Sequence, residues 1–238
     1  MSNCRIRLYQ DSDYDRVREV YSKSVKDLTP DGFYLALRSF HIRLFIFIVF
    51  LLLLVTVRSF LASIFGVVLM LIFVWWCSRD FFHSYVRVTF SSDMLDIQKT
   101  YMQGDSHRFW VAEYGGTVVG MVAVIPSPLV NGEMGMELKR MAVIEGQRGK
   151  GIATALCKTV LDFARTRGSK VVVLETSTVQ TTAQRMYVRM GFRKIKTYDY
   201  GKIKARLIGI RALAGATDHG SMGFIYKMRN TALKRKCI

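Results

Sequence analysis

Cysteine and histidine are scarce in this 238-residue chain, and neither forms a motif. The four cysteines include no Cys-x-x-Cys pair, and the four histidines have no metal-ligand spacing. The sequence therefore predicts neither a disulfide framework nor a zinc site, and we expect no bound metal. The cysteines are Cys4, Cys77, Cys157 and Cys237.

Acidic residues are also few. The chain has 18 of them against 35 lysines and arginines, which gives a net charge of +17. Such an excess predicts an acidic partner, which could be a nucleic acid, an anionic lipid or a polyanionic cofactor. No stretch interleaves basic and aromatic residues as nucleic-acid-binding surfaces do, so we expect no nucleic-acid partner.

Two common nucleotide-binding signatures are missing from the one glycine-rich stretch that stands out, 148–153 (RGKGIA). Lys150 is followed by Gly151 and not by Ser or Thr, which excludes a P-loop. The third glycine of the dinucleotide fingerprint is replaced by Thr154. The stretch lies between an apolar extended run that ends at Val143 and a helical pattern.

The composition of this stretch nevertheless suits a phosphate. Gly149 and Gly151 allow a tight turn and a close approach of the backbone to a ligand. The helix that follows directs its free N–H groups, with a partial charge of about +0.5, at the loop. Arg148 and Lys150 add positive charge, so the loop predicts a phosphate or pyrophosphate site. A flexible strand–helix turn is the simpler alternative.

Long apolar runs explain why half the residues are hydrophobic. The runs 44–57 and 60–77 are separated by Arg58 and Ser59. As helices they would be roughly 21 and 27 Å long, against a hydrocarbon core of about 30 Å. One continuous helix of about 51 Å would be too long to span comfortably. The sequence therefore predicts a hairpin that dips into or crosses a bilayer.

The flanks of these runs predict an orientation. Basic residues on both sides favour placing both ends in the cytosol, and Trp75 and Trp76 suit the headgroup boundary. The alternatives are a buried hairpin of a soluble protein and a signal peptide, for which the segment starts too late and runs too long. The expected domains are an N-terminal strand and helix (1–37), the hairpin (38–80) and a catalytic core with a basic tail (81–238). The flanking residues are Arg38, Arg43, Arg79 and Arg87.

Outside the hairpin, strand and helix patterns alternate. Ser91 or Ser92 is expected to cap a helix that reaches Tyr101, Pro126 and Pro128 are expected in a loop, and 201–221 has the composition of a basic loop. We expect strands at 5–9, 108–114, 117–125, 137–143, 171–174, 193–198 and 223–228, and further helices after Asp13, from 152 to 167 and from 181 to 190.

This order of elements resembles the GCN5-related N-acetyltransferases (GNAT), which bind acetyl-coenzyme A. The resemblance covers 90–200 well and 1–30 loosely. It rests on Arg148-x-x-Gly151-x-Ala153, five residues after Val143, and on the segment 183–192 with Met186-Tyr187 and Gly191-Phe192. It implies an α/β fold, with a mixed central sheet flanked by helices.

The inserted hairpin and the stretch 137–143 (ELKRMAV) are similar to the camello-like, membrane-anchored branch of that family. This branch includes cysteine S-conjugate and aspartate N-acetyltransferases of the endoplasmic reticulum. The resemblance implies direct acetyl transfer from acetyl-CoA to an amine without an acyl-enzyme, so Cys157 is expected to be a packing residue. The expected coenzyme-binding residues are Met141, Ala142, Val143, Arg148, Gly149, Lys150, Gly151, Ile152, Ala153 and Thr154.

Glu137 is the expected general base, because its spacing is similar to that of the base in lysine-acetylating members. It lies six residues before Val143, and this even separation predicts that the two side chains share a face of the strand. By the same alternation, Arg140 should face the other way. Apolar neighbours, Met136 among them, should raise the pKa of Glu137. A strand-end glutamate paired with a lysine or arginine is the alternative.

Tyr187 is the expected general acid, because the resemblance places a tyrosine there that donates a proton to the coenzyme sulfur. A core aromatic residue beside Phe192 is its alternative role. Glu175, at the end of the next strand, is the reserve base.

The function predicted is a membrane-anchored N-acetyltransferase acting on a primary amine, such as that of a cysteine S-conjugate. Acetylation of lysine on histones or secretory proteins is one alternative, and a non-catalytic CoA-binding scaffold is another. The tail places Lys234 and Lys236 in a spacing similar to the dilysine signal that coat proteins read in the cytosol. We therefore expect the endoplasmic reticulum membrane, with cycling to the Golgi and a cytosolic catalytic domain. The alternative is a tail resting on anionic lipid, worth about 1 kcal/mol per charge.

Overall fold

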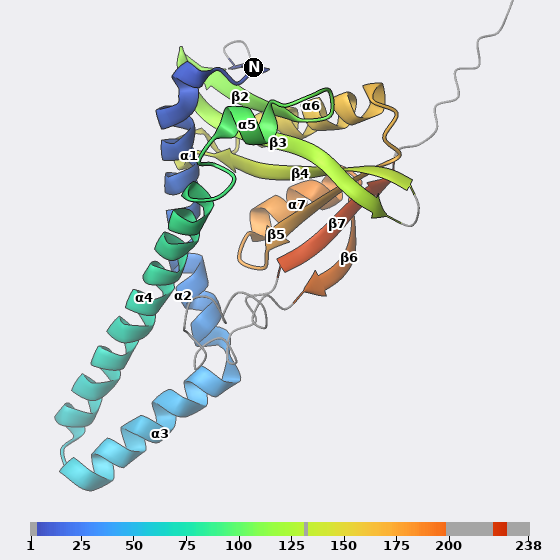
Figure 1. The fold of residues 1–238 in the computed structure, drawn as a ribbon. Coiled ribbons are helices and arrows are strands. Elements are labelled where there is room, and N and C mark those ends of the chain that lie inside the picture. The colour runs from blue at the N-terminus through green and yellow to red at the C-terminus, as the bar shows by residue number, and fades with distance from the viewer. Residues whose placement is uncertain (1–3, 131–132, 199–220, 228–238) are drawn as a thin grey trace, which may run out of the picture.

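One mixed sheet forms the centre of the computed structural model, which describes residues 4–130, 133–198 and 221–227 (Figure 1). Its seven strands lie in the order β1-β2-β3-β4-β5-β7-β6. Neighbours are antiparallel except β4 and β5, which are parallel, so the predicted mixed sheet is confirmed. The strands are β1 Cys4–Leu8, β2 Arg108–Tyr114, β3 Thr117–Val130, β4 Glu133–Val143, β5 Val171–Ser177, β6 Arg193–Tyr198 and β7 Ser221–Lys227.

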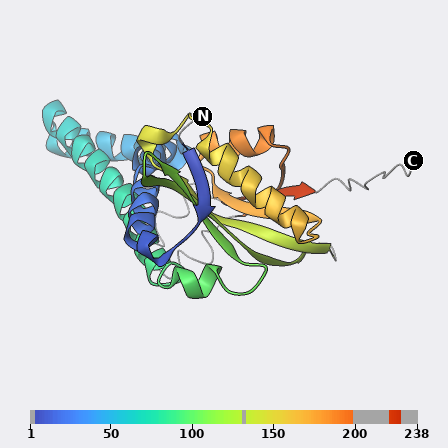
Figure 2. The ribbon, with the colours of Figure 1, turned by 90° about the horizontal axis from the view of Figure 1, so that it is seen from above.

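Helices cover both faces of this sheet (Figures 1 and 2). α6 and α7 lie on one side, here called the α6 face, whereas α1, α5 and the end of α4 lie on the other, the α1 face. Apolar side chains alternate between them along β2 and β3. On β2, for example, Trp110 packs on the α6 face and Val111 on the α1 face. The helices are α1 Tyr14–Lys26, α2 Thr29–Arg38, α3 Phe40–Val57, α4 Phe60–Phe90, α5 Ile97–Tyr101, α6 Ile152–Thr166 and α7 Thr181–Arg189.

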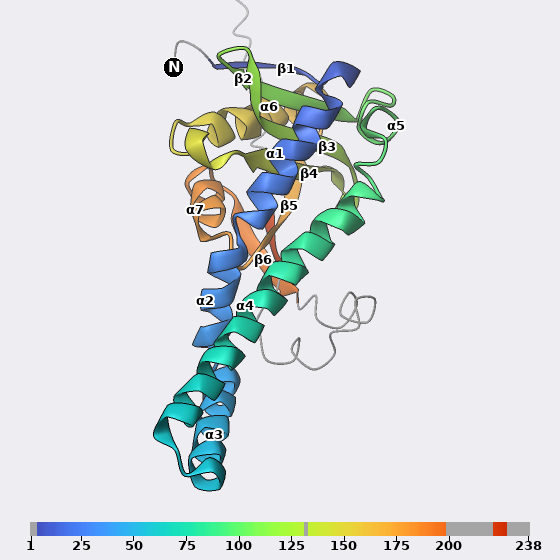
Figure 3. The same ribbon diagram turned by 90° about the vertical axis from the view of Figure 1, so that its left-hand side faces the viewer.

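α3 and α4 form the predicted hairpin, which projects away from the sheet (Figures 1 and 3). It turns at Arg58, whose φ is 52°, and the side chain of Ser59 accepts a bond from the N–H of Ala62. Both helices are long and apolar enough to cross a membrane, and only 6% and 11% of their most apolar windows are buried. That exposure argues against a buried hairpin of a soluble protein.

α4 is longer than the second apolar run, because it continues to Phe90. Its last turns bring Phe82 and Val86 into the core of the α1 face. Ser91 consequently ends α4 and does not begin a new helix. The cap of α5 is Asp96, whose carboxylate accepts a bond from Lys99 N at 2.8 Å, so the predicted serine cap is wrong.

β3 runs on through Pro126 to Val130, where a loop was expected. β2 begins at Arg108, opposite Val124, so within the described residues β3 has no strand on that side beyond this point. Prolines in strands are confined to such edge positions, where one side has no ladder to disrupt. Of the expected basic loop, residues 201–220 lie outside the described residues, as does the tail with Lys234 and Lys236.

Candidate functional site

β4 and β5 separate part of the way along their length. They are paired from Gly135 opposite Val171 to Leu138 opposite Leu174. Beyond that point β4 stays paired with β3, and β5 stays paired with β7. In the described part of the chain, β4 therefore has no strand beside it on the β5 side over 139–143. This free edge, which includes the expected residues 141–143, can pair its main chain with an extended ligand.

On its other side, the same part of β4 carries a β-bulge. Arg140 and Met141 together stand opposite Val122, as the shift in register between β3 and β4 shows. Arg140 has a φ of 52°, in the left-handed region that non-glycine residues seldom adopt. A bulge inserts one residue, so it reverses the alternation of side chains beyond it.

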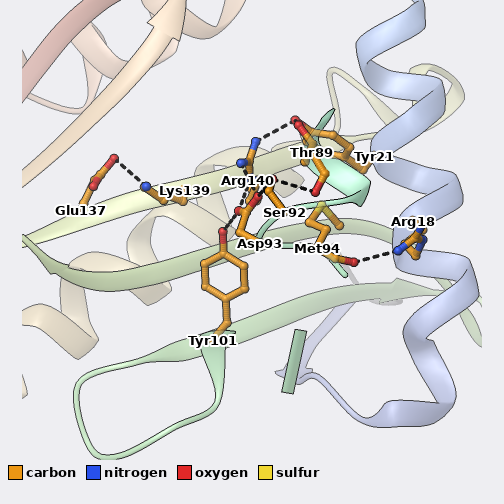
Figure 4. A network of polar contacts seen from close by, with 10 residues as sticks. All are labelled: Arg18, Tyr21, Thr89, Ser92, Asp93, Met94, Tyr101, Glu137, Lys139 and Arg140. Atoms are coloured by element: carbon orange, nitrogen blue, oxygen red, sulfur yellow. Dashed lines mark hydrogen bonds and ion pairs between the residues drawn. The ribbon is translucent and has the colours of Figure 1, made fainter. Parts of the chain in front are cut away.

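The bulge overturns two expectations about faces. Glu137 is paired with Ile125, which packs on the α1 face, whereas Val143 belongs to the α6 face. The predicted shared face of Glu137 and Val143 is therefore wrong. Arg140 contacts Tyr21 on the α1 face, so it lies on the same side as Glu137 and not on the opposite one (Figure 4).

Glu137 is half-buried, with Lys139 Nζ 3.5 Å from its carboxylate (Figure 4). Burial raises the pKa of Glu137, as predicted. Lys139 and Arg140 oppose the rise, and the negative charge of Glu175 adds to it. Met136 lies on the other face and is not the neighbour that we expected. The expected alternative also holds in part, because Glu137 does pair with a lysine.

The glycine-rich loop has the predicted turn. Gly149 and Gly151 have φ angles of 79° and 80°, which a side chain would strain, and Gly151 is the N-cap of α6. The N–H groups of the first helical turn, which begins at Ile152, have no partner within the helix. They lie next in the chain to the free edge of β4, so one anionic ligand could reach both.

The two basic side chains of the loop are held by the protein itself. Arg148 pairs with Asp27 at 2.9 Å and donates through Nε to the carbonyl oxygen of Val143 at 3.0 Å. Lys150 Nζ donates to Gln147 at 2.7 Å. Both charges stay beside the loop. The groups available to bind a ligand are the backbone N–H groups of the first turn of α6, which have no partner within the helix.

A groove of about 710 Å³ continues from Thr154 between α6 and α7. Lys158, Arg185 and Arg189 are among the residues that line it. These three lie outside the loop and were not predicted, because charged residues on exposed helix positions normally have no partner but water. Their charge favours a ligand with phosphates.

Tyr187 is buried on the α6 face, and its ring meets that of Phe192 edge-on, with centroids 5.5 Å apart. Burial, with a smaller effect of Cys157, raises the pKa of Tyr187, so its hydroxyl keeps its proton at neutral pH. This position supports the expected alternative of a core aromatic residue, and the role of proton donor stays a prediction. The structure puts Tyr187 and Glu137 on opposite faces of the sheet.

Cys157 is a packing residue, as predicted. It is buried in the core of the α6 face, and burial raises the pKa of its thiol to about 12. A thiol that stays protonated is a poor nucleophile. Across the described ranges, no three His, Cys, Asp or Glu side chains gather as a metal ion would require.

Comparison with known proteins agrees with this geometry. The profile of the "Acetyltransferase (GNAT) family" matches residues 72–192. Rat N-acetyltransferase 8B is 38% identical over 204 residues, which is 85% of this chain and 91% of the relative. A probable N-acetyltransferase camello of Xenopus tropicalis is 35% identical over 194 residues, 82% of this chain and 88% of the relative.

A solved structure supports the fold alone. The crystal structure of a GNAT acetyltransferase from Staphylococcus aureus Mu50 superimposes with a TM-score of 0.54 at 16% identity, over 95% of this chain and 99% of that one. The chain belongs to the GNAT acetyltransferase family. Within it, the chain falls in the camello-like branch and is an acetyl-CoA-dependent N-acetyltransferase.

The charge next to Glu137 can be tested directly. Replacing Lys139 by methionine should move the pKa of the Glu137 carboxyl further up, because a positive charge that favours the carboxylate is lost. Carboxyl NMR titration of the full chain measures it. Lys23→Met, which removes the lysine paired with Glu19 on α1, is the control and should leave Glu137 unmoved. A pKa of Glu137 that stays the same in Lys139→Met would contradict the contact.

Proposed function

We propose that the protein is a membrane-anchored enzyme that transfers acetyl directly from acetyl-CoA to the primary amine of a small amino-acid conjugate, such as a cysteine S-conjugate. The observation that carries the proposal is the free edge of β4 beside the glycine-rich N-terminus of α6. An edge strand and a helix N-terminus together suit a ligand with an amide arm and a pyrophosphate.

The coenzyme would be held in three places. Main-chain groups of 141–143 would pair with the amides of its pantetheine arm, and N–H groups of 149–154 would bind its pyrophosphate. The groove with Lys158 and Arg185 would receive its remaining phosphate. When bound, acetyl-CoA supplies the activated acetyl thioester. A β4 N–H donating to the thioester oxygen would stabilise the developing oxyanion by roughly 3 kcal/mol.

Protons would be handled from the two faces of the sheet. Glu137 takes the proton of the attacking amine, and its raised pKa makes it a stronger base than an ordinary carboxylate. Tyr187 gives its proton to the departing sulfur. The buried position of Tyr187 keeps the phenol neutral until then. Glu175, whose charge acts on Glu137, remains the reserve base.

The hairpin would anchor this core, with domains at 1–37, 38–80 and 81–238. α3, with 18 residues, is about 27 Å long and so matches a hydrocarbon core of about 30 Å. Arginines on both sides of the hairpin support placing both ends, and the catalytic core, in the cytosol. For the compartment we propose the endoplasmic reticulum, with cycling to the Golgi, on the basis of the tail and its recognition by coat proteins.

An acceptor screen tests the activity. Purified full-length protein with labelled acetyl-CoA should acetylate cysteine S-conjugates faster than lysine peptides. Gly151→Glu should abolish both transfer and coenzyme binding, because it puts an anion where the pyrophosphate lies. Gly168→Glu is the control, since Gly168 has a φ of 69° and open space around it at the other end of α6. Equal coenzyme affinity in a folded Gly151→Glu protein would exclude the loop, and faster transfer to lysine peptides would favour a protein substrate.

Substitutions at the two proton-transfer residues should separate catalysis from binding. Glu137→Gln and Tyr187→Phe should each lower turnover by about 10²–10⁴-fold while acetyl-CoA affinity stays nearly the same. Tyr9→Phe, at another buried tyrosine, is the control for packing. Turnover of Glu137→Gln measured across pH shows whether Glu137 is the general base. Full activity of Glu137→Gln at every pH would assign the role to Glu175 or to water.

Tags at the two ends test the topology. With the hairpin crossing and returning, both tags should be reached by antibody in cells permeabilised only at the plasma membrane. A tag on a lumenal protein serves as the control for an intact internal membrane. One accessible tag and one hidden tag would mean a single crossing and would rule out the proposed orientation.

A further inference from the structure

The bulge of β4 is held by an ion pair with a residue far away in the sequence (Figure 4). Arg140 donates through Nε and Nη2 to the two carboxylate oxygens of Asp93, both at 2.6 Å. Its third nitrogen, Nη1, donates to the Tyr21 hydroxyl at 2.9 Å. The Tyr101 hydroxyl also donates to Asp93. All three nitrogens of the guanidinium therefore have a partner, and its contact with Asp93 has the paired-fork geometry that makes such contacts strong.

This pair stays ionised although it is largely buried, with side chains only 18% and 21% exposed. Burial opposes the charge on Asp93, but the hydrogen bonds and charge of Arg140 outweigh it and lower the pKa of Asp93. Losing either partner would leave the other as an uncompensated buried charge. Removing one partner should therefore destabilise the protein much more than it would at a surface ion pair.

The pair acts at a strained point of the backbone. Arg140 is the bulge residue with a φ of 52°, a conformation that persists only where the surroundings enforce it. Glu137 lies three residues before it and Val143 three residues after it. If the bulge relaxed, Arg140 would return to ordinary strand geometry. Either Glu137 or Val143 would then stand opposite a different residue of β3.

Asp93 follows directly from the hairpin helix. α4 ends at Phe90, and the turn after it is closed by a bond from Met94 N to the carbonyl oxygen of Thr89 at 3.2 Å. Thr89 also bonds the Tyr21 hydroxyl at 3.3 Å, and Arg18 of α1 donates to the Met94 carbonyl at 2.8 Å. The end of α4, α1 and the bulge thus form one polar network.

We propose that Asp93 and Arg140 are positioning residues for acetyl transfer: their ion pair fixes the β4 bulge, and so sets both the free edge that takes the coenzyme and the place of Glu137. The proposal deepens the function proposed above and rests on it. It also means that the helix rising from the hairpin ends on the residues that shape the active site.

Asp93→Asn tests this, since it removes the charge and keeps the shape. We expect the affinity for coenzyme A, measured by calorimetry, to fall together with kcat/KM, the latter by about 10–100-fold, the loss typical of a small misplacement. Asp93→Glu should recover part of it. The control is Asp13→Asn, which breaks another largely buried, two-bond pair, with Arg7 at 2.6 and 2.8 Å, at the far end of the sheet.

A purely structural role predicts that both variants lose thermal stability and that neither changes the kinetics of the folded protein. That outcome would overturn the proposal. Arg140→Gln gives a second readout through the pKa of Glu137. The positive charges of Arg140 and Lys139 lower this pKa, and the negative charge of Glu175 raises it. In Arg140→Gln the pKa of Glu137 should rise, so the acid limb of the kcat/KM profile should move to higher pH. Arg140→Lys should return the acid limb to its original pH but should not restore the affinity for coenzyme A.

The outcomes separate the two proposals. If the unaltered protein binds no coenzyme A, the proposed function fails. If it binds coenzyme A and Asp93→Asn behaves like Asp13→Asn, only the positioning role fails. All measurements are made on the full chain, well below the thermal midpoint of each variant, so that unfolding does not enter.

Discussion

The proposed active site depends on β4, which in the described part of the chain has a neighbouring strand along only part of one edge. β4 hydrogen-bonds β5 only as far as Leu138, and its remaining main-chain groups on that side must find another partner. Because the sheet continues through β5 and β7, the gap stays inside the fold and does not become an ordinary outer edge. An extended ligand there would complete the sheet of the described residues, and the N-terminus of α6, close by in the chain, would receive its charge.

The α1 face joins this site to the hairpin. The same helix, α4, begins as an apolar arm and ends in the core with Phe82 and Val86. Large apolar side chains along the arms stay exposed, Leu61 at 78% and Val55 at 74%. Each apolar Å² left in water forgoes about 25 cal/mol, so this surface suits lipid. In the proposed anchoring, one continuous helix would run from the lipid into the core of the α1 face.

Periodicity predicted most of the fold, because segments such as α1 and α6 bury one face along their whole length. It failed at the bulge, where one residue is inserted. The bulge at Arg140 leaves no trace in the composition, and it reverses which face of the sheet each later side chain of β4 is expected to occupy. α2 was missed because Pro30 and Gly32 suggest a break. Proline, however, is tolerated in a first turn, and a Cβ on Gly32 would lie 2.7 Å from Phe82. The site loop was predictable from local sequence, whereas the Asp93–Arg140 pair spans 47 positions and was not.

The length of α4 has a kinetic consequence. Beyond Cys77 the helix runs on for about 20 Å before it ends, so with its apolar part in a bilayer the reaction centre is held at a nearly fixed height over the lipid. In the proposed membrane-anchored enzyme, an acceptor that dissolves in the headgroup layer would search for the site by diffusing in a plane and not in a volume. Its effective concentration would follow its partition coefficient, and amines with an apolar substituent would reach the site far more often than their concentration in water suggests.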